Sequence, residues 1–236
     1  MSDETPLRLP SVDPLEATRP HPSTLTPELL AGLLADGDDE LVAWVLRDAL
    51  AERSRAEVYD GLLREAMDLV GERWASGRWT VAEEHLASQT LLRALDAVRP
   101  DPGPEGRTGP LAVLAGVAGE RHMIGLVCLD HILQESAWTV ADLGADVPID
   151  DLARFVARNE VALVALAASD PARGSVVAET AAAVRAARPS TPPLPIIVGG
   201  RFTGDPAATS GLDVDRVVGS LVEAEVFARG LAARLT

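Results

Sequence analysis

The sequence predicts an α/β protein with an all-α cap, in which a four-helix bundle precedes a Rossmann-like (flavodoxin-like) parallel sheet of five strands. The pattern of apolar residues changes near residue 100. Before it, apolar residues recur at helical spacing; after it, short apolar runs alternate with helical segments. A segment with three prolines, 99–109, separates the two patterns and indicates a linker. Alternating strands and helices are typical of a parallel sheet covered on both faces.

The cap is assigned to residues 26–98. Its first helix is expected after Thr26-Pro27, because threonine is a favoured N-cap and proline a favoured first helical residue. Further helices are expected near 38–52, 54–74 and 80–98, the last opened by a capping box at 80–83. Amphipathic helices joined by short connections indicate a bundle.

The α/β domain is assigned to residues 110–236. Strands are expected near 110–117, 138–143, 161–167, 194–199 and 215–218, and helices near 122–136, 149–158, 171–187 and 220–234. Residues 1–25 are rich in proline and lack periodicity, which predicts a mobile tail.

Charge and composition restrict the classes of function. The net charge is −15, and the 21 basic residues, all arginine, are scattered along the chain, which argues against direct binding of nucleic acid. The apolar runs are no longer than strands, so no membrane association is expected. The chain shows no signal-peptide pattern. With a single cysteine, Cys128, a disulfide framework is excluded and a cytoplasmic location is expected.

The segment Glu120-Arg121-His122, with Gly125 three residues later, follows the first predicted strand. Parallel sheets bind ligands at the carboxyl ends of their strands. One imidazole nitrogen of His122 can bind a metal while Glu120 holds the other. Gly125 lets a bulky ligand approach the backbone. The pattern therefore predicts a metal site with His122 as the ligand.

Small or polar residues also follow the other strands. Gly144 follows the second strand, Ser169 the third and Gly199-Gly200 the fourth. Such residues allow a large flat or phosphorylated ligand to lie across this edge of the sheet.

A second group of residues lies in the cap. Trp74 ends the third predicted helix, and Val81, Glu84 and His85 share one face of the fourth. An aromatic ring beside a carboxylate and an imidazole suits a nucleoside. The alternative is that Trp74 is a core residue and Glu84-His85 a solvated surface pair.

Together these residues resemble the cobalamin-binding module, over residues 26–236. Glu120, His122 and Gly125 match its Asp/Glu-x-His-x-x-Gly motif, and Gly199-Gly200 matches its Gly-Gly motif. The resemblance implies bound cobalamin with His122 as the lower axial cobalt ligand. The family's Ser-x-Leu motif falls on Ala167-Ala168-Ser169, a departure that leaves Ser169 as the candidate hydroxyl.

The spacing Trp74-x9-Glu84-His85, with Val81 between, resembles the signature of the light-sensing adenosylcobalamin regulators of the CarH/LitR type. The resemblance implies adenosylcobalamin as the cofactor, with these cap residues facing its adenosyl group. A short acidic tail stands where those regulators carry a helix-turn-helix domain of the MerR kind. Ala75 stands where the best-known members have a histidine that takes the cobalt after light. Water, His85 and His21 are the alternatives for that sixth ligand.

The resulting prediction is a non-enzymatic photoreceptor that senses light by photolysis of the cobalt–carbon bond. It is expected to signal to a protein partner such as a transcription regulator, through movement of the cap away from the α/β domain. The alternatives are a corrinoid protein that carries a methyl group for a methyltransferase system, and a cobalamin chaperone or storage module. A methyl group would leave Glu84 and His85 without partners, which disfavours the methyl carrier. Homo-oligomerisation is left open.

Overall fold

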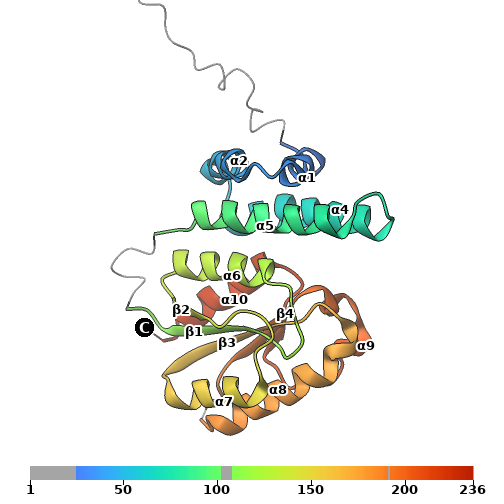
Figure 1. Cartoon of the computed structure of the whole chain (residues 1–236). Coiled ribbons are helices and arrows are strands. Elements are labelled where there is room, and N and C mark those ends of the chain that lie inside the picture. Colours follow the sequence, from blue (N-terminus) through green and yellow to red (C-terminus); the bar gives the residue numbers. More distant parts are fainter. Residues whose placement is uncertain (1–24, 102–107, 191, 236) are drawn as a thin grey trace, which may run out of the picture.

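The computed structural model describes residues 25–101, 108–190 and 192–235. All but the last residue of the predicted tail therefore lies outside the described residues, as do residues 102–107 of the predicted linker. Within the described ranges, a layer of helices lies over one face of an α/β sandwich (Figure 1). No helix in these ranges is long and apolar enough to cross a membrane.

The helical layer begins with α1 (Pro27–Asp36) and α2 (Asp39–Glu52). The predicted third helix is a continuous run of α3 (Arg55–Val58), the π-helical segment η3 (Tyr59–Leu63) and α4 (Arg64–Ala75), and α5 (Val81–Ala97) follows. The predicted caps form: Thr26 accepts the N–H of Leu29, and Thr80 and Glu83 make both hydrogen bonds of a capping box. These side chains satisfy N–H groups that a helix start leaves unpaired.

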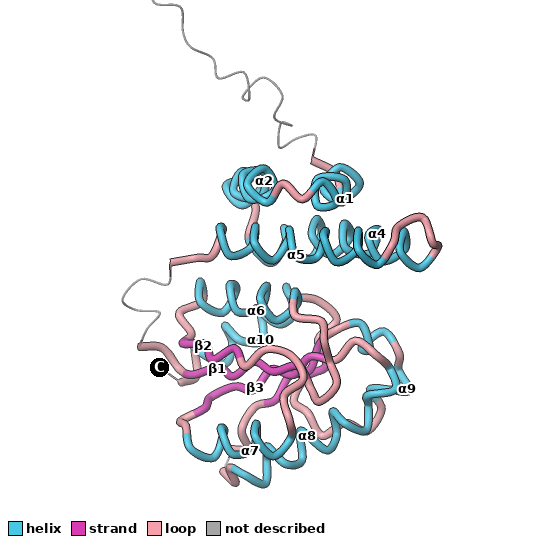
Figure 2. The backbone as a smooth tube through the Cα atoms, viewed as in Figure 1, coloured by secondary structure: helices cyan, strands magenta, loops and turns pink. Residues whose placement is uncertain are grey.

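The sheet has five parallel strands in the order β2-β1-β3-β4-β5, as the fold class predicts. The strands are β1 (Leu111–Gly116), β2 (Thr139–Asp142), β3 (Val161–Ala167), β4 (Ile196–Gly199) and β5 (Arg216–Val217). The helices α6 (Ile124–Glu135) and α10 (Leu221–Ala232) cover the face toward the cap, and α7 (Ile149–Arg158) and α8 (Gly174–Ala187) cover the other (Figure 2). The short elements η5 (Pro171–Arg173), η6 (Arg201–Gly204) and α9 (Pro206–Thr209) complete the loops after β3 and β4.

The strand order places a topological switch point between β1 and β3. The chain leaves β1 for β2 on one side of it, whereas β3 and the later strands follow on the other side. Loops that diverge from neighbouring strands leave a crevice at the carboxyl edge of a parallel sheet, where ligands bind. The loop after β1 contains His122, and the loop after β3 contains Ser169.

The cap is joined to the α/β domain by more than the linker. Cys128 and Ile132 of α6 belong to the buried apolar cluster of the cap. Asp60 of η3 accepts the N–H groups of Leu221 and Val222, at 3.0 and 2.9 Å, and so caps the first turn of α10. The α3–η3 end of the cap is therefore anchored on α6 and α10.

Candidate cofactor site at the carboxyl edge of the sheet

Glu120 and His122 form a tight pair in the loop between β1 and α6. Glu120 is only 2% exposed, whereas the His122 side chain is 78% exposed. The Nδ1 of His122 lies 2.6 Å from Oε1 of Glu120, which also accepts the backbone N–H groups of Arg121 and His122 at 2.8 Å. With Nδ1 engaged by the carboxylate, Nε2 is the nitrogen left for a metal, as in metal-binding histidines generally.

Ser169 contributes to this pair through its backbone. Its N–H donates to Oε2 of Glu120, a backbone contact that was not predicted from the sequence. Burial alone raises the pKa of Glu120, but the hydrogen bonds from His122 and Ser169 outweigh it and hold the pKa below its ordinary value. The group is therefore a carboxylate at neutral pH and accepts a hydrogen bond from Nδ1–H of His122.

A metal at this site would need ligands from elsewhere. In residues 25–101, 108–190 and 192–235, no group of three or more His, Cys, Asp or Glu side chains is placed to hold an ion. Of the residues predicted here, His122 could supply one nitrogen to a metal. Around Gly125, a Cβ would meet nothing within 4 Å, which leaves open space beside the histidine.

The glycines at the other strand ends have reasons in the fold itself. A Cβ on Gly199 would lie 3.1 Å from Cγ2 of Val218. Gly200 has a φ of +107°, and a Cβ there would lie 2.1 Å from the carbonyl oxygen of Ala168. Gly144 lies beside Met123, whose exposed side chain adds an apolar group next to His122 that was not predicted from the sequence.

The predicted cap residues lie at the surface. Trp74 is 52% exposed and Val81 is 54% exposed, so Trp74 is not a core residue. Oε2 of Glu84 lies 3.5 Å from Nε2 of His85, whose side chain is 71% exposed, and Ser88 donates to Oε1 of Glu84 at 2.9 Å. Glu84 and His85 thus contact each other at the surface, beside an exposed aromatic ring.

The two groups of residues lie on the same side of the molecule. The end of α4 and the start of α5 extend past the first turn of α6, in the direction in which the strands end (Figure 1). Arg201, directly after Gly199-Gly200, pairs with Asp68 of α4 at 3.5 Å. Neither residue was predicted from the sequence: Arg201 is signalled by its place after the glycines, whereas an aspartate inside a helix gives no signal.

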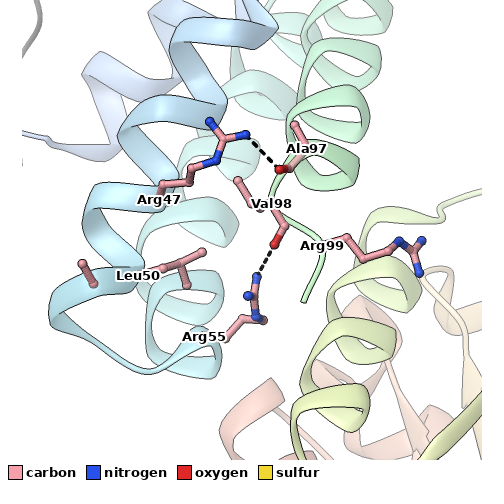
Figure 3. A pocket seen from close by; sticks show the side chains of 7 residues that line it. Arg47, Leu50, Arg55, Ala97, Val98 and Arg99 are labelled. Carbon is pink, nitrogen blue, oxygen red and sulfur yellow. Dashed lines mark hydrogen bonds between the residues drawn. The ribbon is translucent and has the colours of Figure 1, made fainter. Parts of the chain in front are cut away.

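The cleft in Figure 3 lies at the opposite end of the cap, where α2 and α5 end, and its arginine residues have a structural role. It is lined by Arg47, Leu50, Ala51, Arg55, Ala97, Val98 and Arg99, none of them a predicted site residue. Arg47 donates to the carbonyl of Ala97 at 2.9 Å and Arg55 to that of Val98 at 3.0 Å. These guanidinium groups satisfy carbonyls that the end of α5 leaves unpaired.

Both parts of the chain match a known domain family. Residues 28–99 and residues 110–227 each match a family described as B12 binding domain. The HTH-type transcriptional repressor CarH of Myxococcus xanthus is 34% identical over 183 residues, 77% of this chain and 59% of that protein. The repressor CarA of the same organism is 33% identical over 169 residues, 70% of this chain and 54% of that protein.

Corrinoid proteins are also similar to the chain. The dimethylamine corrinoid protein of Methanosarcina barkeri is 30% identical over 128 residues, 53% of this chain and 59% of that protein. The chain thus spans somewhat more than half the length of these relatives. The solved monomethylamine corrinoid protein of M. barkeri shares the fold, with a TM-score of 0.68 at 16% identity over 86% of this chain and 96% of that one. The predicted resemblance to the cobalamin-binding module is confirmed, and the chain belongs to the B12 binding domain family.

Proposed function

We propose that this protein is a regulatory photoreceptor that holds adenosylcobalamin between the His122 loop and the overhanging end of the cap. The observation that carries the proposal is the exposed Trp74 and Val81 on the side of the molecule where His122 lies. Exposed large apolar side chains that gather at a site commonly mark a binding surface. His122 would supply the lower axial nitrogen to cobalt, and the corrin ring the equatorial ligands.

The polar residues of the cap support an adenosyl rather than a methyl upper ligand. Trp74 offers a flat ring for stacking on adenine. Glu84 and His85 offer a carboxylate and an imidazole to ribose hydroxyls, in place of the contact they make with each other. Bound adenosylcobalamin would bring a cobalt–carbon bond that light breaks; the chain's part is to bind the adenosyl group in the dark and to respond when it leaves.

The response is proposed to involve the free end of the cap. The α3–η3 end is held on the α/β domain by buried contacts, whereas the α4 end is held by the exposed Arg201–Asp68 pair. Exposed ion pairs contribute little to stability. Loss of the adenosyl group would therefore release the α4 end first, and the cap would tilt about its anchored end instead of separating as a whole.

The output is proposed to reach a protein partner in the cytoplasm, such as a transcription regulator, without catalysis by this chain. The net charge of −15 disfavours contact with DNA phosphates. The similarity to proteins named transcriptional repressors supports a regulatory role. Long-range electrostatic attraction between an acidic protein and the basic surface of a DNA-binding partner would speed their association.

The second candidate is a corrinoid protein that carries a methyl group for a methyltransferase. It is favoured by the similarity to the dimethylamine corrinoid protein. A methyl group is too small to reach across to Glu84 and His85, so in a methyl carrier these residues would have no ligand group to bind.

Titration with adenosylcobalamin and methylcobalamin in the dark, followed by green light, separates the two candidates. The photoreceptor is expected to bind adenosylcobalamin more tightly and to change its elution volume or its capture of a partner from lysate after illumination. Equal affinities for the two cofactors, with light-independent capture of a methyltransferase, would establish the methyl carrier instead.

A further inference from the structure

The turn that leads from β1 into the His122 loop has a central peptide that is held from outside the turn. The N–H of Glu120 donates to the carbonyl of Val117 at 2.8 Å, and Gly119 has a φ of +81°, the value of the third residue of a type II turn. In this turn the carbonyl of Ala118 and the N–H of Gly119 have no partner within the turn. Both groups instead bond to charged side chains from two other loops.

Arg173 holds the carbonyl. It ends η5 in the loop after β3, and its NH1 donates to the carbonyl oxygen of Ala118 at 3.0 Å. A Cβ on Gly119 would lie 2.1 Å from the same nitrogen, so only glycine lets the guanidinium lie against this peptide. Asp170 accepts the N–H of Ala172 at 2.9 Å and so fixes the short helix that presents Arg173.

Asp146 holds the N–H. Its Oδ1 accepts from the N–H of Gly119 at 2.5 Å, from the loop between β2 and α7. Asp146 has a φ of +54°, in the left-handed region that aspartate adopts more readily than most residues. A cation at the carbonyl and an anion at the N–H both match the dipole of the peptide between them.

We propose that Arg173 and Asp146 are positioning residues that hold the His122 loop in the geometry for binding the metal of a cofactor. Type I and type II turns differ in the orientation of the central peptide. The two charged partners select one orientation. Glu120 is the last residue of the turn, and its carboxylate fixes His122, so the orientation of the peptide sets the direction of the imidazole. The metal-binding role rests on the proposed function, whereas the restraint on the turn does not.

The test uses the full chain and four variants. Arg173→Met and Asp146→Gly remove the charged partners, and the glycine also relieves the positive φ, so that backbone strain does not confound the result. Arg173→Lys keeps a cationic donor, and Asp146→Asn keeps an acceptor oxygen. Far-UV circular dichroism verifies that each variant folds.

The first measurement is hydrogen exchange of residues 117–123 without cofactor. Exchange at Gly119 is expected to be about tenfold faster in Arg173→Met and Asp146→Gly, as for the loss of one hydrogen bond to a charged group. The Asn variant is expected to exchange like the unchanged chain, and the Lys variant at an intermediate rate. Unchanged exchange in both disruptive variants would overturn the restraint on the turn.

The second measurement is electron paramagnetic resonance of the chain labelled with 15N-histidine and loaded with cob(II)alamin, in which a histidine nitrogen on cobalt splits each cobalt line into a doublet, whereas the cofactor's own unlabelled base gives a triplet. The disruptive variants are expected to lose part of this splitting, and the conservative variants to keep more of it. If the unchanged chain shows no such splitting, the proposed cofactor site is wrong, and the exchange measurement still decides the restraint on the turn. Full splitting in both disruptive variants would overturn their role in metal binding.

Arg188→Met is the matched control. In the unchanged chain, NH1 of Arg188 donates to the carbonyl of Asn159 at 2.8 Å. This is the same kind of bond as the one that Arg173 makes, but it lies in the connection that follows α7. This variant is expected to change neither measurement. An equal change in the control would assign the effects to a general loss of stability and overturn the proposal.

Discussion

The hydroxyl of Tyr59 lies 2.9 Å from Nδ1 of His131, and this buried contact joins the cap to α6. Arg55 donates to the same oxygen at 2.7 Å, which leaves the hydroxyl hydrogen to form the hydrogen bond to Nδ1. In that arrangement the neutral imidazole carries its proton on Nε2, a buried atom with no hydrogen-bond partner among the described residues. Burial, with added effects of the Arg55 and Arg99 charges, lowers the pKa of His131 to about 3.

Tyr59→Phe is expected to destabilise the protein by about 1–3 kcal/mol, because Nδ1 of His131 would be left buried without its donor. Arg55 would lose one acceptor and keep Glu135, at 2.8 Å. Denaturant unfolding followed by circular dichroism measures the change. A loss below about 0.5 kcal/mol, typical of an uncoupled surface site, would show that the contact does not hold the cap.

The unfolding free energy is expected to fall with acid in a way that depends on His131. An unfolded histidine has a pKa of about 6.5, so between that pH and about 3 the unfolded chain binds a proton that the folded chain does not. Stability is therefore full above pH 6.5 and falls as the pH decreases, by up to about 1.4 kcal/mol per unit. His131→Gln removes this slope, whereas parallel curves for the two proteins would contradict the buried neutral histidine.

Asp60→Ala is expected to cost about 0.5–2 kcal/mol, as for the loss of a helix N-cap. Asp60 caps a helix of the α/β domain, and Asp38, which accepts the N–H of Leu41 at 3.0 Å, caps α2 within the cap. Asp38→Ala therefore serves as the matched control. Both variants should lose similar stability, but only Asp60→Ala should speed hydrogen exchange at Leu221 and Val222. Equal exchange there in both variants would contradict an anchoring role for Asp60.

Replacing Glu84 and His85 together with alanine is expected to narrow the preference for adenosylcobalamin over methylcobalamin by about thirtyfold, since each residue contributes roughly 1 kcal/mol of hydrogen bonding to the ribose. Arg93→Ala, on α5 but paired with Asp39 at 3.2 Å, is the control and should keep the preference. Isothermal titration calorimetry with each cofactor measures the two affinities and therefore the preference. A preference that survives the double substitution would remove these residues from the site.

Much of the fold could be predicted from the sequence because its elements are signalled locally. Buried parallel strands appear as apolar runs, and β3 (Val161–Ala167) has the predicted ends. The π-helical segment η3 was not predicted, since the apolar spacing continues through it. The short helices η6 and α9 have too few residues to show a period.

The candidate site was predictable only where its residues are neighbours in sequence. Glu120 and His122 lie two residues apart, and their pairing follows from that spacing. The amide of Ser169 has no signal, because any residue but proline offers the same N–H. Asp146 and Arg173 are two of many charged residues, and nothing in the sequence marks them. Their hydrogen bonds to Gly119 and Ala118 form only because the fold brings the loops after β1, β2 and β3 together.

The absorption spectrum of bound adenosylcobalamin, for the chain and for His122→Ala, tests the central claim most directly. The chain is expected to bind the cofactor with its nucleotide base displaced from cobalt and His122 in its place, and the variant should lose that spectrum or bind much more weakly. Identical spectra and affinities for the two proteins would contradict the assignment of His122 as the axial ligand, and with it the proposed site.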